Sequence, residues 1–268
     1  MMKKDTDKIK KMVRKGYAKA IQKNTKCCSS GSCCGSVSQP KVISKKVGHS
    51  DADMNAVPEG ANLGFGCGNP VAFAAIREGD IVLDLGSGAG FDVFLAAQKV
   101  GKTGRVIGVD MTPEMIAKAK ENARKGDYAN VEFGLGEIEK LPVDDRSVDL
   151  IISNCVINLS PEKEKVFQEA YRVLKPGGKF MVSDLVLTRD LPEDLKGSID
   201  AYVGCLAGAI KKDDYLAHIK AAGFRDVKVL SEANYPADAM FEDLKSAEGA
   251  VSSIKVSAIK GKNTGGGM

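Results

Sequence analysis

The stretch IVLDLGSGAG, from Ile81 to Gly90, decides the fold. Its first half is a short apolar run, interrupted by Asp84, of the kind that forms a strand buried in a parallel sheet. Glycines then dominate residues 86–90, where missing side chains let the backbone approach a ligand closely. Residues 91–100 follow with helical spacing. The stretch therefore predicts a strand, a glycine turn and a helix, the first unit of an α/β Rossmann-like sheet.

A second apolar run, residues 106–109, ends in Asp110, about 20 residues after the glycines. A carboxylate at this place can accept hydrogen bonds from two ribose hydroxyls. The glycines Gly86, Gly88 and Gly90 run G-x-G-x-G, which differs from the G-x-G-x-x-G of dinucleotide-binding loops. With Asp84 before it and Asp110 after it, the loop resembles the cofactor loop of class I S-adenosylmethionine-dependent methyltransferases. The alternative is a turn that uses glycine for packing alone.

Composition limits the function classes. The 268 residues carry a formal net charge of +4, which is too small to indicate a nucleic-acid partner. No stretch approaches the roughly 18 consecutive apolar residues of a membrane helix, and the N-terminus lacks the apolar core of a secretory signal. We expect a cytoplasmic monomer without a nucleic-acid or membrane partner. Its seven cysteines should then be mostly reduced.

The chain divides into four predicted parts. A helix over residues 7–22 and a flexible cysteine-rich segment make up residues 1–54, and residues 55–190 form the methyltransferase core. Residues 191–260 supply a substrate-binding part and an antiparallel pair of edge strands near residues 227–230 and 254–259. A disordered tail occupies residues 261–268. We expect a mostly parallel sheet with helices on both faces.

Three single cysteines lie in unusual settings. Cys67 is surrounded by glycines, which favours a ligand or reactive role over a buried structural one. Cys155 follows a predicted strand over residues 148–153, at the sheet edge where ligands bind, although free cysteine is also a common small core residue. Cys205 lies among small residues, which would also suit tight helix packing.

Two cysteine pairs, Cys27-Cys28 and Cys33-Cys34, lie in the N-terminal segment. Zinc sites usually separate paired ligands by two to four residues, so adjacent cysteines disfavour a folded zinc ribbon. Two interpretations remain. The segment is either a mobile thiol donor that closes over a site, or a disordered tail that picks up metal adventitiously.

Taken together, six segments make the chain resemble the arsenite S-adenosylmethionine methyltransferases. The three single-cysteine contexts are the most restrictive of them, since methyltransferases in general share the glycine loop. The segments are VPEGANLGFGCGNP (57–70), LDLGSGAGFD (83–92), GVDMTPEM (108–115), GEIEKLP (136–142), SNCVINL (153–159) and VGCLAGA (203–209).

The resemblance implies that S-adenosyl-L-methionine methylates trivalent arsenic, supplied as arsenite or its thiol adducts, in arsenic detoxification. It implies arsenic binding at Cys67, Cys155 and Cys205, with a helper among the four N-terminal cysteines, and a thiol reductant such as glutathione or thioredoxin. Glu137 would accept from the adenine amine, unless it is an ordinary exposed loop acid, and Ile138 would contact a ring nitrogen through its amide. The implied cofactor-binding residues are Asp84, Gly86, Ser87, Gly88, Gly90, Asp110, Met111, Glu137, Ile138 and Asn154.

Two other functions stay open. A class I methyltransferase acting on a carbon, oxygen or sulfur acceptor, such as a quinone or sterol precursor, would leave the three cysteines without a shared purpose. A non-catalytic thiol protein that only binds arsenic would have no use for the acids Asp84, Asp110 and Glu137.

Overall fold

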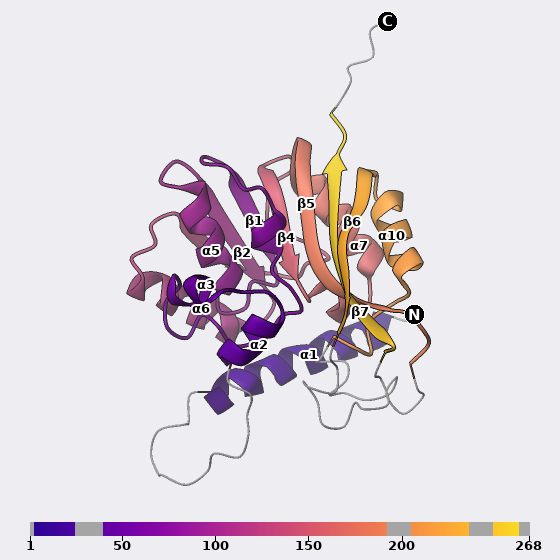
Figure 1. The fold of residues 1–268 in the computed structure, drawn as a ribbon, viewed down its shortest axis with the longest axis horizontal. Coiled ribbons are helices and arrows are strands. Elements are labelled where there is room, and N and C mark those ends of the chain that lie inside the picture. The colour runs from indigo at the N-terminus through magenta and orange to yellow at the C-terminus, as the bar shows by residue number, and fades with distance from the viewer. Residues whose placement is uncertain (1–2, 25–39, 192–204, 236–248, 263–268) are drawn as a thin grey trace, which may run out of the picture.

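The computed structural model describes residues 3–24, 40–191, 205–235 and 249–262. Its centre is a seven-stranded sheet in the order β3-β2-β1-β4-β5-β7-β6. The first five strands of this order are parallel, and β7 runs antiparallel between β5 and β6 (Figure 1). This confirms the predicted mostly parallel sheet with an antiparallel C-terminal edge. The strands are β1 (Ile81–Leu85), β2 (Arg105–Asp110), β3 (Val131–Leu135), β4 (Val148–Asn154), β5 (Leu174–Leu187), β6 (Phe224–Asn234) and β7 (Val251–Lys260).

Helices cover both faces of the sheet. Side chains alternate between the two faces along each strand, so Val82 packs with the helices of one face and Leu83 with those of the other. The first face carries α4 (Pro70–Phe73), α5 (Phe91–Val100) and α6 (Pro113–Lys125). The second carries α7 (Lys163–Val173) and α10 (Lys212–Ala221), and a short 3-10 helix, η1 (Ile157–Leu159), follows β4.

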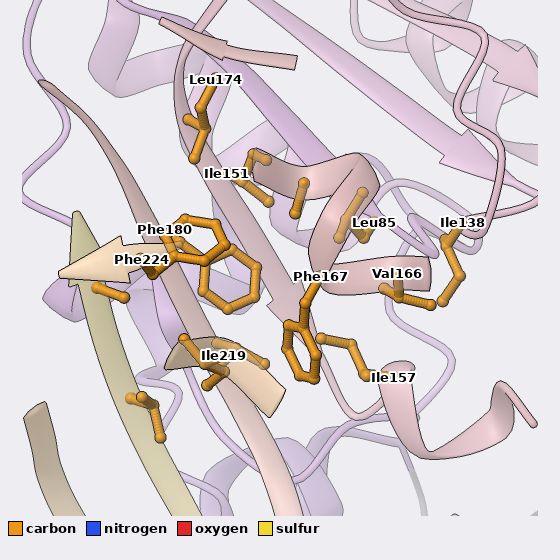
Figure 2. Packing of buried hydrophobic residues seen from close by; sticks show 14 of the residues in the cluster. Leu85, Ile138, Ile151, Ile157, Val166, Phe167, Leu174, Phe180, Ile219 and Phe224 are labelled. Atoms are coloured by element: carbon orange, nitrogen blue, oxygen red, sulfur yellow. The ribbon is translucent and has the colours of Figure 1, made fainter. Parts of the chain in front are cut away.

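The core beneath α7 and α10 contains a group of packed aromatic rings among aliphatic side chains. Figure 2 shows Phe167 of α7 close to Phe180 of β5, with ring centroids 6.0 Å apart in an edge-to-face arrangement. Phe224 of β6 packs on Phe180 at 5.3 Å. All three rings are buried, and burying a side chain of this size contributes roughly 1.5–3 kcal/mol. This packing fixes the antiparallel edge against the parallel part of the sheet.

The sequence predicts the helices near the glycine loop well. Helix α5 spans the residues with helical spacing, and α6 begins with Pro113 at its first position and ends at Lys125, just before Gly126. The sequence Thr112-Pro113-Glu114 is typical of an N-cap followed by proline at the first helical position, and Thr112 does occupy the N-cap position, although its side chain makes no capping hydrogen bond. Proline fits a first helical position because the amide it lacks would have no helical partner there.

One local prediction is wrong. Residues 39–62 show little periodicity in the sequence, which indicates a connecting segment, but α2 (Pro40–Lys46) and α3 (Asp51–Asn55) lie there. Helices this short show no periodicity, and α3 is set by a capping box between Ser50 and Asp53. Residues 174–178 read LKPGG and predict a turn that leads into the strand at Lys179. The structure agrees, although β5 is counted from Leu174: Leu174 pairs with Val148, the next pair is Lys179 with Leu150, and Gly177 between them has a φ of +83°.

Helix α1 (Lys3–Asn24) is longer than the predicted 7–22 and lies across the lower end of the sheet (Figure 1). Its Val13 is fully buried. None of the helices among the described residues has the length and apolarity needed to cross a membrane. The four N-terminal cysteines, and residues 263–268 of the predicted tail, lie outside the described residues.

Candidate active site

The glycine loop is joined to β2 through its backbone. The amides of Gly86 and Ser87 both donate to the carbonyl of Val109, at 2.7 and 3.0 Å. Gly86 has a φ of +69°, and a Cβ there would lie 2.4 Å from the side chain of Val156. Backbone conformation and crowding therefore both require glycine at this position.

Asp110 is oriented by two backbone amides. One carboxylate oxygen accepts from the amide of Thr112 at 2.8 Å and the other from the amide of Gly88 at 3.0 Å. Burial raises the pKa of Asp110, and these two hydrogen bonds oppose that rise. Each oxygen keeps a lone pair, because a carboxylate offers about four acceptor sites. The side chain is thus arranged to accept two ligand hydroxyls.

A cavity of about 220 Å³ opens beside this loop. Ser87 contributes a buried hydroxyl oxygen that has no hydrogen-bond partner among the described residues. A buried polar atom without a partner in the protein indicates that a polar group of a ligand binds there. Gly90 does not line the cavity; a Cβ there would lie 2.6 Å from the ring of Phe94, so this glycine serves the turn. The predicted cofactor residues that line the cavity are Asp84, Gly86, Ser87, Gly88, Asp110, Met111, Ile138 and Asn154.

Glu137 is the other predicted residue that does not line the cavity. Its carboxylate accepts from Lys10 of α1 at 2.9 Å and from Arg14 at 3.4 Å. Lys10 also lies 3.1 Å from Glu139 and 3.7 Å from Glu162. Burial alone would lower the pKa of Lys10, but its bonds to these acids outweigh burial and raise it. These ion pairs hold α1 over the cavity.

The three single cysteines come together, although they lie far apart in the sequence. The Sγ atoms of Cys67 and Cys155 and a carboxylate oxygen of Asp184 all lie within 4.8 Å of one another. Cys205 donates its thiol to the carbonyl of Cys155, with 2.7 Å between sulfur and oxygen. All three are buried free thiols. Cys155 and Cys205 line the cavity, whereas Cys67 does not.

Two of these cysteines adopt unusual backbone conformations. Cys155 has a φ of +58° and Cys205 a φ of +64°. Left-handed conformations are uncommon for residues other than glycine, and such strain concentrates at functional sites. Here it turns the chain immediately after β4, so that Cys155 joins the other two sulfurs. We call Cys67, Cys155 and Cys205 the sulfur side of the cavity, and residues 86–90 with Asp110 its cofactor side.

The surroundings of Cys67 and Cys155 favour the thiol over the thiolate. Hydrogen bonds to Cys205 and Cys67, and then burial, raise the pKa of Cys155 well above its ordinary value. Burial also raises the pKa of Cys67. A ligand that binds these sulfurs must therefore displace their protons.

A buried polar network lies next to the sulfurs, and sequence reasoning missed it. Asp184 of β5 accepts from Tyr215 at 3.1 Å and from Asn158 at 2.9 Å. Burial raises the pKa of Asp184 to about 6, and burial lowers the pKa of the nearby Lys163 to about 8. These residues come from β5, α10, η1 and α7, and the sequence contains no local signal that joins them.

Sequence reasoning also missed the part of α1 that covers the cavity. Lys10, Val13 and Tyr17 all line it, at the i, i+3 and i+7 spacing of one helix face. The ring of Tyr17 meets that of Phe65 edge-to-face, with centroids 5.3 Å apart. The helical pattern was visible in the sequence, but nothing in it indicated that this face packs on the sulfur side.

Comparison with known proteins agrees with this geometry. Residues 76–223, more than half of the chain, match a methyltransferase domain family. An arsenite methyltransferase from Halobacterium salinarum is 50% identical over 233 residues, which make up 84% of this chain and 59% of that protein. The chain thus spans well under two thirds of the length of this relative.

Two further relatives place the chain more narrowly. The crystal structure of CrArsM, an arsenic(III) S-adenosylmethionine methyltransferase from Chlamydomonas reinhardtii, superposes with a TM-score of 0.64 at 36% identity, covering 83% of this chain and 74% of that one. A ubiquinone/menaquinone C-methyltransferase from Escherichia fergusonii is 35% identical, but over 48% of this chain and 51% of its own. The chain therefore belongs to the arsenite S-adenosylmethionine methyltransferase family.

Proposed function

We propose that this protein transfers methyl groups from S-adenosylmethionine to trivalent arsenic held by the thiolates of Cys67, Cys155 and Cys205. The observation that carries the proposal is the convergence of these sulfurs beside a cavity that Asp110 also lines. The names of the Halobacterium and Chlamydomonas relatives support arsenite as the substrate. The proposed cofactor contacts are Gly86, Ser87, Gly88 and Asp110 of the cofactor side, together with Asp84, Met111 and Ile138.

Sulfur suits this substrate. Trivalent arsenic is soft and prefers thiolate over oxygen or imidazole ligands, for the reason that soft metals select cysteine. When arsenite binds, its three hydroxides leave as water with the three thiol protons, so the exchange balances without a further base. The arsenic keeps a lone pair directed away from the sulfurs, and this lone pair is the nucleophile. S-adenosylmethionine supplies an electrophilic methyl group when bound.

The contribution of the chain is then mainly alignment. Good orientation of two reactants lowers a barrier by at most about 7–11 kcal/mol. Cys155 and Cys205 both line the cavity, within reach of a ligand whose ribose lies on Asp110. Methyl transfer oxidises arsenic to the pentavalent state, so a thiol reductant such as glutathione or thioredoxin is the second proposed co-substrate. The protein is proposed to work as a monomer in the cytoplasm.

A methyltransferase for a carbon, oxygen or sulfur acceptor is the second candidate, and the quinone C-methyltransferase relative favours it. That function gives no reason to gather three thiols, two of them lining the cavity in left-handed conformations and the third beside them. It predicts full turnover after Cys155→Ser.

The test is incubation with arsenite, S-adenosylmethionine and glutathione, followed by arsenic speciation with mass spectrometry. We expect methylated arsenic in the complete mixture and none without S-adenosylmethionine. Absence of methylated arsenic under reducing conditions would refute the proposal. Arsenite binding without any binding of S-adenosylmethionine would instead identify a protein that only sequesters arsenic.

A further inference from the structure

Asn154, the last residue of β4, makes four hydrogen bonds within the protein. Its side-chain oxygen accepts from the amides of Cys67 at 3.1 Å and Gly68 at 3.2 Å. Its side-chain nitrogen donates to the carbonyl of Gly68 at 2.8 Å and to the carboxylate of Asp92 at 3.0 Å. A carboxamide has two donor hydrogens and two acceptor lone pairs. All four are used, so the side chain has none left for a cofactor.

The loop that carries Cys67 is shaped around this side chain. Gly66 has a φ of +130°, and a Cβ there would lie 2.9 Å from the side-chain nitrogen of Asn154. A Cβ on Gly68 would lie 2.5 Å from the hydroxyl of Ser183. The glycines on either side of Cys67 therefore allow the loop to approach β4 and β5 closely. This closeness brings a sulfur from outside the sheet to the end of β4.

We propose that Asn154 is a positioning residue that sets the place of the Cys67 sulfur relative to that of Cys155. One strand end then controls two of the three sulfurs: Cys155 through the turn that follows Asn154, and Cys67 through the Asn154 side chain. We call the hydrogen bonds between Asn154 and the Cys67 loop the clamp. The inference rests on the proposed function, because it assigns this clamp a role in arsenic binding. It replaces the cofactor contact that the sequence resemblance implied for Asn154.

The bond from Asn154 to Asp92 ties this clamp to the helix that follows the glycine loop. Asp92 lies in the first turn of α5, one residue into the helix that Gly90 caps. Its position is fixed by the helix, which packs on β1 and β2 as part of the sheet core. Asn154 therefore holds the Cys67 loop against a rigid element rather than against another loop.

The test is a double-mutant cycle with Asn154→Ala and Cys67→Ser, using the full-length protein. We expect Asn154→Ala to weaken arsenite binding about 10- to 100-fold, because it removes four partly buried hydrogen bonds that hold the Cys67 loop. On the Cys67→Ser background the same change should alter arsenite binding less than about 2-fold, because its target sulfur is gone. S-adenosylmethionine binding should stay unchanged in every variant.

Asn130→Ala is the matched control. It also removes a carboxamide that donates to two backbone carbonyls, those of Ala97 and Gly101, but away from the cavity. We expect it to lower stability without changing arsenite affinity. Amide hydrogen exchange of residues 66–68 gives a readout that needs no arsenic, and Asn154→Ala should speed it while leaving residues 86–90 unchanged.

The inference would be overturned if Asn154→Ala weakened arsenite binding equally in the presence and absence of the Cys67 sulfur. It would also be overturned if Asn154→Ala weakened S-adenosylmethionine binding and left hydrogen exchange at residues 66–68 unchanged. Failure of the unmodified protein to bind arsenite would refute the proposed function alone. In that case the hydrogen exchange of residues 66–68 still decides whether Asn154 holds the loop.

Discussion

On the cofactor side of the cavity, Asp110 is held by amides only 2 and 22 residues away in sequence, those of Thr112 and Gly88. On the sulfur side, Cys67 is held by partners 87 and 186 residues away: its amide donates to Asn154, and its carbonyl accepts from Ser253 at 2.7 Å. One half of the site is thus made by a local strand-loop-helix unit. The other half exists only when the whole sheet has formed. The two halves should therefore respond to mutation independently.

The strongest test of this independence removes a sulfur from the cavity wall. We expect Cys155→Ser and Cys205→Ser each to reduce every arsenite methylation step by more than about 100-fold, because these are the two sulfurs that line the cavity and both are needed to hold arsenic in line with the methyl group. Binding of S-adenosylmethionine, measured by calorimetry, should not change. A parallel loss of cofactor affinity would mean that the halves are not separate.

The buried acid Asp184 lies beside Cys67 and Cys155 on the sulfur side. Its titration makes the free energy of unfolding depend on pH. The raised pKa of Asp184, about 6, means that the folded state holds this proton more tightly than the unfolded state does. Its stabilising effect is therefore present below pH 4 and lost as pH rises through 6, about 3 kcal/mol in all.

Asp184→Asn cannot titrate, so the stability of the wild type relative to this variant should fall between pH 4 and pH 7. Urea unfolding at both pH values measures the difference, and the other carboxylates cancel in the comparison. A difference that stays constant over this range would contradict the proposed environment of Asp184.

On the cofactor side, Asp110→Asn should raise the Kd for S-adenosylmethionine about 10- to 100-fold. The asparagine side chain keeps one acceptor oxygen, but its NH2 group would face a backbone N–H that the carboxylate had accepted from. Hydrogen bonds to charged groups contribute about 1.5–3 kcal/mol. Arsenite affinity, measured without the cofactor, should match that of the unmodified protein. Weaker arsenite binding in Asp110→Asn would show that the loop also supports the sulfur side.

Helix α1 is expected to break the comparison, because its residues Lys10, Val13 and Tyr17 line the cavity that the two halves share. Lys10→Met leaves Glu137, Glu139 and Glu162 without their shared cation and loosens the helix that also carries Tyr17. We expect affinities for both arsenite and S-adenosylmethionine to fall about 3- to 10-fold, as for a partly buried ion pair. Arg14→Met is the control: Arg14 is 42% exposed and contacts Glu137 at 3.4 Å, so its loss should change either affinity less than 2-fold. Equal effects of the two changes would remove the special role of Lys10.

The same contrast explains what the sequence could predict. The strand, glycine turn and helix from Ile81 to Val100, and Asp110 after them, follow from local residue patterns, and the structure has them at the expected residues. The resemblance also singles out Cys67, Cys155 and Cys205, which the structure brings together. Their roles as arsenic ligands stay a prediction.

The rest depends on contacts between distant segments. No local pattern shows that Lys10 of α1 reaches Glu137, or that Asn154 makes three of its four side-chain hydrogen bonds to the Cys67 loop and the fourth to Asp92. The short helices α2 and α3 were missed for another reason, since fewer than two helical turns leave no periodicity to detect.

The most direct test of the central claim is X-ray absorption spectroscopy of the arsenite complex at the arsenic edge. We predict a first shell made of sulfur alone in the unmodified protein, with the share of sulfur reduced by each of the variants Cys67→Ser, Cys155→Ser and Cys205→Ser. An oxygen shell like that of free arsenite, or a sulfur shell unchanged by all three substitutions, would contradict the account.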